Sequence, residues 1–182
     1  MSIEFKKIND GFKDLEAAED IYIEAFPELN EIPFSVFFEF EKNGDGFIQA
    51  AYDKGKLIGY IAYLKCAKII LIENFAVLKE VRDKGYGSKI LTSFMDMYRQ
   101  KNPDVEFFLD VEEPVEDAPN LEQRKKRIAF YERLGFKMTH IKDSFMGIVY
   151  ITMTTMWPQD KEKLDKIKIQ VNKIYKKYQL LN

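Results

Sequence analysis

A short loop that carries two glycines and three charged residues is the part of the sequence best suited to chemistry. It reads Arg82-Asp83-Lys84-Gly85-Tyr86-Gly87 and lies between an apolar stretch and a segment with helical spacing. Glycines let the backbone turn tightly and bring N–H groups close to a ligand, and the first turn of a following helix adds unpaired N–H groups with partial positive charge. The pattern predicts an anion site suited to a pyrophosphate, to which Arg82 and Lys84 can add charge-assisted contacts.

The spacing of the glycines separates this loop from two common nucleotide-binding motifs. It lacks the earlier glycine of a Walker A phosphate loop, and the chain contains no G-x-G-x-x-G dinucleotide fingerprint. A plain glycine turn between a strand and a helix would account for the two glycines equally well. Binding of ATP by this loop is therefore one hypothesis, and the missing Walker spacing speaks against it.

The chain has one cysteine, Cys66, and one histidine, His140. These numbers exclude a disulfide framework and a Cys/His metal site within one chain, so no metal is predicted. Cys66 lies in an apolar run and is interpreted as a small buried hydrophobe. A thiol nucleophile with His140 as its base is the less favoured alternative, because nothing in the sequence places the two residues together.

The composition favours a single globular domain and disfavours several other classes of protein. The 182 residues are 46% hydrophobic and 32% charged, with a net charge of −2. No strong basic field is available for nucleic acid, and no apolar run approaches the length of a membrane span. The first residues, Met1-Ser2-Ile3-Glu4-Phe5, contain no secretory apolar region. We therefore expect a cytoplasmic protein that binds neither nucleic acid nor membrane.

Hydrophobic periodicity predicts strands and helices in mixed order. Strands are expected over residues 3–8, 47–52, 57–64, 69–77, 105–111, 136–141 and 149–157. Helices are expected over 12–26, from Pro33 to the breaker at 43–46, and over 88–100, 121–134 and 160–178. This order favours an α/β or α+β fold, in which a mixed, twisted, mostly antiparallel sheet is flanked by helices. We expect one domain over 1–158, followed by an amphipathic helix over 159–182 that packs on it or, as the second choice, forms a homodimer contact.

Two motifs in this order resemble those of the GNAT superfamily of N-acetyltransferases. Arg-x-x-Gly-x-Gly, which follows the apolar run Phe75-Ala76-Val77, resembles the family's motif A. The run Ala129-Phe130-Tyr131-Glu132-Arg133-Leu134-Gly135-Phe136 resembles motif B. The helix and strand predicted between the two motifs also match the family layout, and the resemblance covers residues 47–157.

The resemblance implies acetyl-CoA as the cosubstrate. By position it assigns the pyrophosphate to the loop residues Arg82, Asp83, Lys84, Gly85, Tyr86, Gly87 and Ser88. It also assigns the pantetheine arm and the acetyl carbonyl to the backbone of Phe75, Ala76 and Val77. The motif-B tyrosine of the family commonly protonates the departing thiolate, which implies this role for Tyr131, and a tyrosine hydroxyl is chemically able to fill it.

Three carboxylates are candidates for the general base. Glu73 lies on the strand that should hold the acetyl group and shares a face with Phe75 and Val77 if the strand has a period of two. Asp110 and Glu112, at the end of another strand, are the second and third candidates. Each could instead be a solvated or paired carboxylate, and many such enzymes work with ordered water and no single essential base.

Two positions depart from the family pattern. Arg124 stands seven residues before Tyr131, where many members have an Asn that meets the pantetheine arm, and Arg127 replaces the usual Ala. The run 124–127 is expected to form a charged, solvated helix face, with contact to a CoA phosphate as the alternative.

The resemblance places the acceptor near the segments 26–34 and 112–120. The second segment carries Glu112, Glu113, Glu116 and Asp117, which could attract a cationic amine or form a solvated loop. The sequence thus predicts an acetyl-CoA-dependent N-acetyltransferase that acts on a small-molecule or peptide amine by direct attack. A non-catalytic acyl-CoA-binding module on the same fold is the alternative, because Arg124 and Arg127 are unusual and no base is secure.

Overall fold

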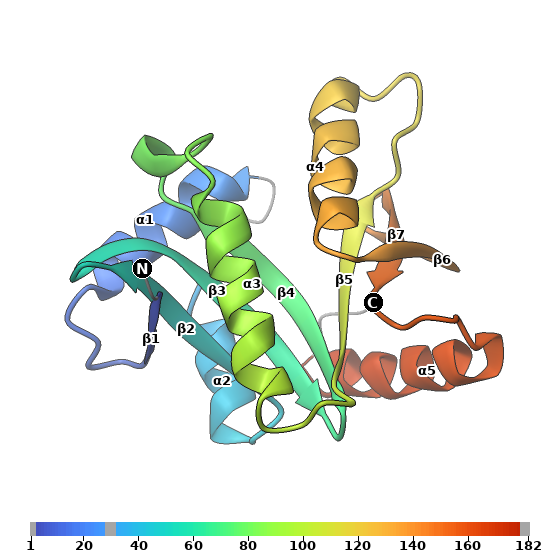
Figure 1. The fold of residues 1–182 in the computed structure, drawn as a ribbon, viewed down its shortest axis with the longest axis horizontal. Coiled ribbons are helices and arrows are strands. Elements are labelled where there is room, and N and C mark those ends of the chain that lie inside the picture. Colours follow the sequence, from blue (N-terminus) through green and yellow to red (C-terminus); the bar gives the residue numbers. More distant parts are fainter. Residues whose placement is uncertain (1–2, 28–31, 179–182) are drawn as a thin grey trace. The chain divides into compact units, whose positions relative to one another are not determined.

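The computed structural model describes residues 3–27 and 32–178, which divide into two compact units, Met1–Val105 and Glu106–Asn182. Unit 1 contains β1 (Glu4–Lys7), α1 (Leu15–Ala25), α2 (Val36–Lys42), β2 (Gly46–Asp53), β3 (Lys56–Cys66), β4 (Ile69–Val77), a 3-10 turn (Lys79–Val81) and α3 (Tyr86–Arg99). Unit 2 contains β5 (Glu106–Glu112), α4 (Leu121–Arg133), β6 (Lys137–Phe145), β7 (Ile148–Thr154) and α5 (Lys161–Lys177). The predicted class, a sheet flanked by helices, is confirmed (Figure 1).

The strands of unit 1 form an antiparallel ladder in the order β1-β2-β3-β4. Because successive side chains on a strand point to opposite faces, Tyr60 and Tyr63 of β3 lie on different sides of this sheet. The Tyr60 ring packs 5.4 Å from the ring of Phe34, which precedes α2, and the Tyr63 ring packs 4.9 Å from Phe94 of α3. We call these sides the α1/α2 face and the α3 face (Figure 1).

Two hairpins turn through pairs of residues with positive φ. Lys54 and Gly55 connect β2 to β3 with φ of 49° and 76°, and Met146 and Gly147 connect β6 to β7 with φ of 50° and 77°. Two left-handed residues in succession suit the twist of a tight hairpin. The strands predicted over 47–52 and 57–64 place the first turn between them. The second turn was not predicted, because methionine is not a turn signal. The strand predicted over 136–141 consequently continues to Phe145.

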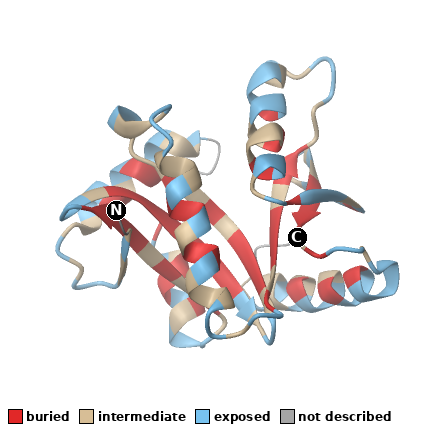
Figure 2. Ribbon diagram, viewed as in Figure 1, coloured by how far each residue is buried: buried red, intermediate tan, exposed pale blue. Residues whose placement is uncertain are grey.

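Unit 2 pairs β7 with both β5 and β6, again antiparallel. The terminal helix α5 packs against β6, and two polar contacts join them: Lys168 to Asp143 at 2.6 Å, and His140 to Asp165 at 2.8 Å. One side of α5 is buried (Figure 2), and this stripe consists of Leu164, Ile167 and Val171. The division into a domain over 1–158 and a following helix stays a prediction. Across the described residues, every helix is too short or too polar to span a bilayer.

Candidate functional site

The loop between β4 and α3 passes twice through the left-handed region of backbone space. Asp83 has a φ of 59° and Gly85 a φ of 77°, with one residue of ordinary geometry between them. Gly85 adopts this φ without penalty because it has no Cβ. Backbone that alternates in this way turns successive N–H groups toward a common point, which is the geometry of an anion-binding nest.

The first turn of α3 continues the same surface. The helix begins at Tyr86, two residues earlier than its periodicity predicts, and Gly85 is its N-cap. Gly85 offers no side chain to the first-turn amides, and no described residue accepts a hydrogen bond from Tyr86, Gly87 or Ser88 N–H in its place. These amides lie at the positive end of the helix dipole, which suits a phosphate oxygen.

Arg82 already holds two protein groups. Its Nε donates to the Val77 carbonyl at 2.9 Å, and its two terminal nitrogens contact the carboxylate of Glu24 near the end of α1. The hydrogen bond from Arg82 lowers the pKa of Glu24. The charge contact with CoA phosphate that was predicted for Arg82 would therefore compete with Glu24.

Two further loop side chains are also held within unit 1. The Lys84 ammonium donates to the Glu80 carbonyl at 2.7 Å, so this side chain folds back over its own loop. The Tyr86 hydroxyl donates to Asp53 at 3.0 Å and thereby ties the start of α3 to the end of β2. This hydrogen bond raises the pKa of Tyr86. The backbone amides are thus the groups of the loop that are most available to an anion.

The backbone of β4 presents alternate amides to β3 and to its other edge. Leu78 donates its N–H to the Ile58 carbonyl of β3 at 2.9 Å. Since hydrogen-bonded positions alternate along an antiparallel ladder, Ala76 also turns its amide groups to β3, while Phe75 and Val77 turn theirs away. The contact from Arg82 to the Val77 carbonyl agrees with this direction. The predicted backbone contact of Ala76 is therefore not supported, whereas Phe75 and Val77 have the orientation that such a contact needs.

The candidate base Glu73 lies at an irregularity of β4. Tyr63 of β3 pairs with Ile72, and the next partner pair is Ala62 with Asn74, so Glu73 is the extra residue of a β-bulge. Bulges redirect side chains and are frequent beside active sites. Because the bulge interrupts the period of two, the face of the Glu73 side chain does not follow from counting residues along the strand.

In unit 2 the candidate acid Tyr131 is buried on α4. Its ring lies 5.1 Å from Phe130 and 5.8 Å from Phe136, and its hydroxyl forms no hydrogen bond with any residue that the structure describes. Burial raises the pKa of Tyr131 to about 12, although the Arg127 guanidinium one turn earlier opposes the rise. The hydroxyl is therefore protonated at neutral pH and able to donate a proton or a hydrogen bond.

The second candidate base, Asp110, faces a different set of groups. Its carboxylate accepts a hydrogen bond from the Thr152 hydroxyl at 2.6 Å, and Lys168 of α5 and Asp143 of β6 are close enough to act on its charge. Burial raises the pKa of Asp110, while Thr152 and Lys168 oppose the rise. Within unit 2, Asp110 thus belongs to the polar contacts beside α5.

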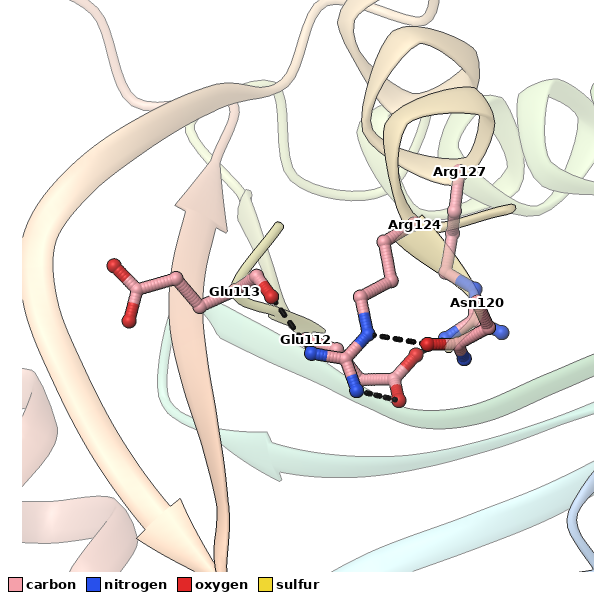
Figure 3. A network of polar contacts seen from close by, with 5 residues as sticks. All are labelled: Glu112, Glu113, Asn120, Arg124 and Arg127. Atoms are coloured by element: carbon pink, nitrogen blue, oxygen red, sulfur yellow. Dashed lines mark hydrogen bonds and ion pairs between the residues drawn. The ribbon is translucent and has the colours of Figure 1, made fainter. Parts of the chain in front are cut away.

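The third candidate, Glu112, is enclosed by two arginines of α4 (Figure 3). One of its oxygens lies 3.2 Å from an Arg124 nitrogen and the other 2.7 Å from an Arg127 nitrogen. Arg124 also donates to the Asn120 side chain and to the Glu113 carbonyl, both at 2.7 Å. The side chains of Glu112 and Arg124 are only 9% and 10% exposed. The Glu113 carboxylate contacts Lys142 of β6.

This network corrects one expectation and decides between two alternatives for another residue. The run 124–127 is not a solvated helix face at Arg124, because that residue is buried and uses three of its nitrogens on protein groups. For Glu112 the structure shows the paired alternative, because its carboxylate lies against two guanidinium groups. The network instead fixes the start of α4 to the end of β5.

A comparison with protein families matches residues 15–136 to the model described as the acetyltransferase (GNAT) family. The chain belongs to the GNAT acetyltransferase family. The match contains the whole loop between β4 and α3 and also Tyr131. A search of curated proteins gave no match to the sequence.

Solved structures show the GNAT fold across the chain. A GNAT-family protein from Bacteroides thetaiotaomicron, named as an acetyltransferase, superimposes with a TM-score of 0.78 at 21% identity and covers 94% of this chain and 97% of its own. A GNAT acetyltransferase from Elizabethkingia anophelis with acetyl-CoA bound gives 0.58 at 14% identity, with 84% and 97% covered. Naa50 from Arabidopsis thaliana, in complex with the bisubstrate analogue CoA-Ac-MVNAL, gives 0.60 at 20% identity, with 86% and 100% covered. The predicted mixed, mostly antiparallel GNAT-like sheet with an additional C-terminal helix is thus confirmed.

One polar residue of this GNAT chain was missed in the sequence. Asn74 of β4 is 8% exposed, yet its side-chain amide forms no hydrogen bond with any residue that the structure describes. It pairs with Ala62, which lies two residues from Tyr60, so Asn74 belongs to the α1/α2 face. A polar residue inside the apolar run 69–77 was the available signal. Of the predicted acceptor segment 26–34, residues 28–31 lie outside the described residues.

Proposed function

We propose that this GNAT acetyltransferase transfers an acetyl group from acetyl-CoA to a primary amine of a small molecule or peptide, by direct attack in a ternary complex. The observation that carries the proposal is the start of α3, where uncapped first-turn amides follow the left-handed residues Asp83 and Gly85. A diphosphate needs several N–H donors and positive potential at one place, and this backbone supplies both.

The pantetheine arm and the acetyl group of acetyl-CoA would lie along β4. The outward amides of Phe75 and Val77 suit the amide groups of a pantetheine arm, and an outward N–H can also bond the acetyl carbonyl. Attack by an amine places negative charge on that carbonyl oxygen, and a fixed backbone donor stabilises this charge. Arg82 would compete with the pantetheine arm for the Val77 carbonyl.

The proposed reaction has a balanced sequence of steps. The acceptor loses a proton to Glu73 or Asp110, directly or through water, because a lysine-like ammonium with a pKa of about 10.4 cannot attack. The neutral nitrogen then forms the new C–N bond as the C–S bond breaks. Tyr131, whose raised pKa keeps its proton in place at neutral pH, gives that proton to the departing thiolate. The new amide nitrogen loses its extra proton to water, and a proton from water restores the Tyr131 hydroxyl.

Acceptor binding by Glu112 and Glu113 would require the loss of existing ion pairs. Both carboxylates have basic partners within unit 2, so an acceptor amine would have to displace an arginine or a lysine. We therefore propose no role in acceptor binding for the network around Glu112.

Calorimetric titration with acetyl-CoA, with ATP as the control ligand, tests the donor site. We expect saturable binding of acetyl-CoA alone, and we expect Gly85→Ala to weaken it about tenfold, since a Cβ at φ of 77° costs about 1–2 kcal/mol and reshapes the loop. Gly55→Ala is the matched control, because Gly55 has a φ of 76° in a distant hairpin and, like Gly85, has nothing within 4 Å of an added Cβ. Preferential binding of ATP, or unchanged affinity in Gly85→Ala, would contradict the assignment.

A turnover assay separates the enzyme from a non-catalytic acyl-CoA-binding module. Release of the CoA thiol is measured with a panel of amines at saturating acetyl-CoA. Amine-dependent release supports the acetyl transfer proposed here. Binding of acetyl-CoA without release by any amine of the panel favours the binding module.

A further inference from the structure

We propose that Asn74 recognises the acceptor, and that the acceptor is an α-amine next to an amide group, as in an amino acid amide or the N-terminus of a peptide. The inference rests on the proposed function, because it names the substrate class of the same reaction. It starts from a side chain that has no hydrogen-bond partner among the described residues and lies on the strand that we expect to hold the acetyl group.

Asn74 is nine-tenths buried, and its amide has no hydrogen-bond partner among the described residues. The fully buried side-chain atoms without a partner do not include this amide, so water or a ligand can reach it. The hydroxyl of Tyr60, which is 0% exposed, lies beside it and also has no hydrogen-bond partner among the described residues, although buried polar groups are nearly always bonded. Tyr60 pairs with Ala76 and Asn74 pairs with Ala62, so the two side chains are diagonal neighbours on the α1/α2 face.

The chemistry of the side chain indicates what it would bind. An asparagine amide has donors and an acceptor side by side, and another amide is a group that matches both at once. A carboxylate would use only the Asn74 donors, and an ammonium would use only the Asn74 acceptor. The surroundings on this face are aromatic: the Tyr60 ring lies 5.4 Å from Phe34, which lies 5.5 Å from Tyr22. An acceptor with an apolar side chain suits them.

The pKa of the acceptor favours an α-amine over a lysine-like amine or a polyamine. An α-amine has a pKa of about 7.7–8.0, which leaves about a tenth of it neutral at pH 7, compared with less than a thousandth of a lysine-like amine.

The test compares phenylalaninamide with phenethylamine, which has the same ring and amine but lacks the amide. For each variant we take the ratio of kcat/KM for the two probes, so the different pKa values of the probes cancel between variants. We expect Asn74→Ala to lower this ratio about tenfold or more, because the amide of the probe loses its partner. Gln49→Ala is the matched control: Gln49 also has a buried, unbonded amide oxygen, but it pairs with Ile61 and belongs to the α3 face.

The outcomes are distinct. An unchanged ratio in Asn74→Ala, or an equal fall in Gln49→Ala, overturns the inference, as does a wild-type protein that acetylates other amines but not phenylalaninamide. Acetyl-CoA affinity, measured on the same variants, should stay at the wild-type value, so failure of the donor site is recognised separately. A tetrapeptide that begins with phenylalanine distinguishes the two sources of the amide: a higher kcat/KM than phenylalaninamide assigns a peptide N-terminus, and a lower one assigns a free amino acid amide.

Discussion

Replacement of Glu112 by glutamine should destabilise the protein strongly. The substitution removes the negative charge between Arg124 and Arg127 and leaves the guanidinium of Arg124, whose side chain is 10% exposed, without its counter-charge. Removal of one partner of a buried ion pair costs about 3–5 kcal/mol. The low end applies here, because glutamine keeps one acceptor oxygen, Arg124 keeps two other hydrogen bonds, and Arg127 is 35% exposed and can be hydrated.

The expected loss of about 3 kcal/mol corresponds to a fall of about 6–12 °C in Tm for a chain of this size. Thermal unfolding followed by circular dichroism measures it. Glu113→Gln is the matched control, because the Glu113 carboxylate meets Lys142 at the surface while its carbonyl, which Arg124 uses, is unchanged. Surface pairs contribute about 0–1 kcal/mol, so this variant should lose no more than about 4 °C.

A double-mutant cycle with Arg124→Met isolates the interaction between Glu112 and Arg124. We expect the double variant to be less destabilised than the sum of the two single variants, because it no longer contains a buried charge without its partner. Equal, small Tm shifts for Glu112→Gln and Glu113→Gln would refute the buried network. The same result together with a raised KM for the acceptor in Glu112→Gln would support the original prediction that Glu112 binds the acceptor.

Two further predictions concern the donor side of the reaction. Tyr131→Phe should lower kcat about 100-fold or more and leave acetyl-CoA affinity unchanged. Because the pKa of Tyr131 is about 12, the wild-type rate should rise with pH as the amine deprotonates and should show no falling limb below pH of about 10. An unchanged kcat would contradict this assignment, and a falling limb below pH of about 10 that disappears in Tyr131→Phe would contradict the raised pKa. Glu24→Gln should free Arg82 for phosphate and tighten acetyl-CoA binding up to about fivefold in calorimetry, an effect that added salt reduces; weaker binding would mean that Glu24 serves to position Arg82.

The backbone of the proposed donor loop could be predicted from sequence because its properties are local. Two glycines, a preceding apolar strand and a following helix fix the backbone over a few residues, and the family motif includes them. The start of α3 at Tyr86 was the local error, because periodicity detects the apolar stripe of a helix and not its first turn. Gly85 ends the loop and begins the helix at once, which the left-handed φ of 77° makes possible.

The network around Glu112 could not be predicted in the same way. The run 124–127 contains four basic residues, and such runs are usually solvated. Burial of Arg124 depends on the end of β5 and on the loop to Asn120, which bring three acceptors to one guanidinium. Only the tertiary structure of unit 2 provides this arrangement. The spacing of Arg124 and Arg127 by three residues, which places both on one side of a helix, was the sole hint.

Asn74 was missed for a different reason. Alternation along β4 would be reliable if the strand were regular, but the bulge at Glu73 shifts the count by one residue. The faces of Ile72 and Asn74 therefore follow only from their partners on β3, which are Tyr63 and Ala62. A bulge has no residue signature in this run, since glutamate and asparagine are both compatible with a regular strand position.

The geometry of β4 would allow this strand to bind the two proposed substrates without conflict. Backbone amides lie in the plane of the sheet, so the outward groups of Phe75 and Val77 act at the edge of the strand. Side chains stand roughly perpendicular to that plane, so Asn74 acts on the α1/α2 face. A side-chain substitution at position 74 should therefore change the choice of acceptor and leave the donor contacts intact. A change at Gly59, where an added Cβ would lie 2.4 Å from the Ala76 carbonyl, should instead displace β4 itself and disturb both.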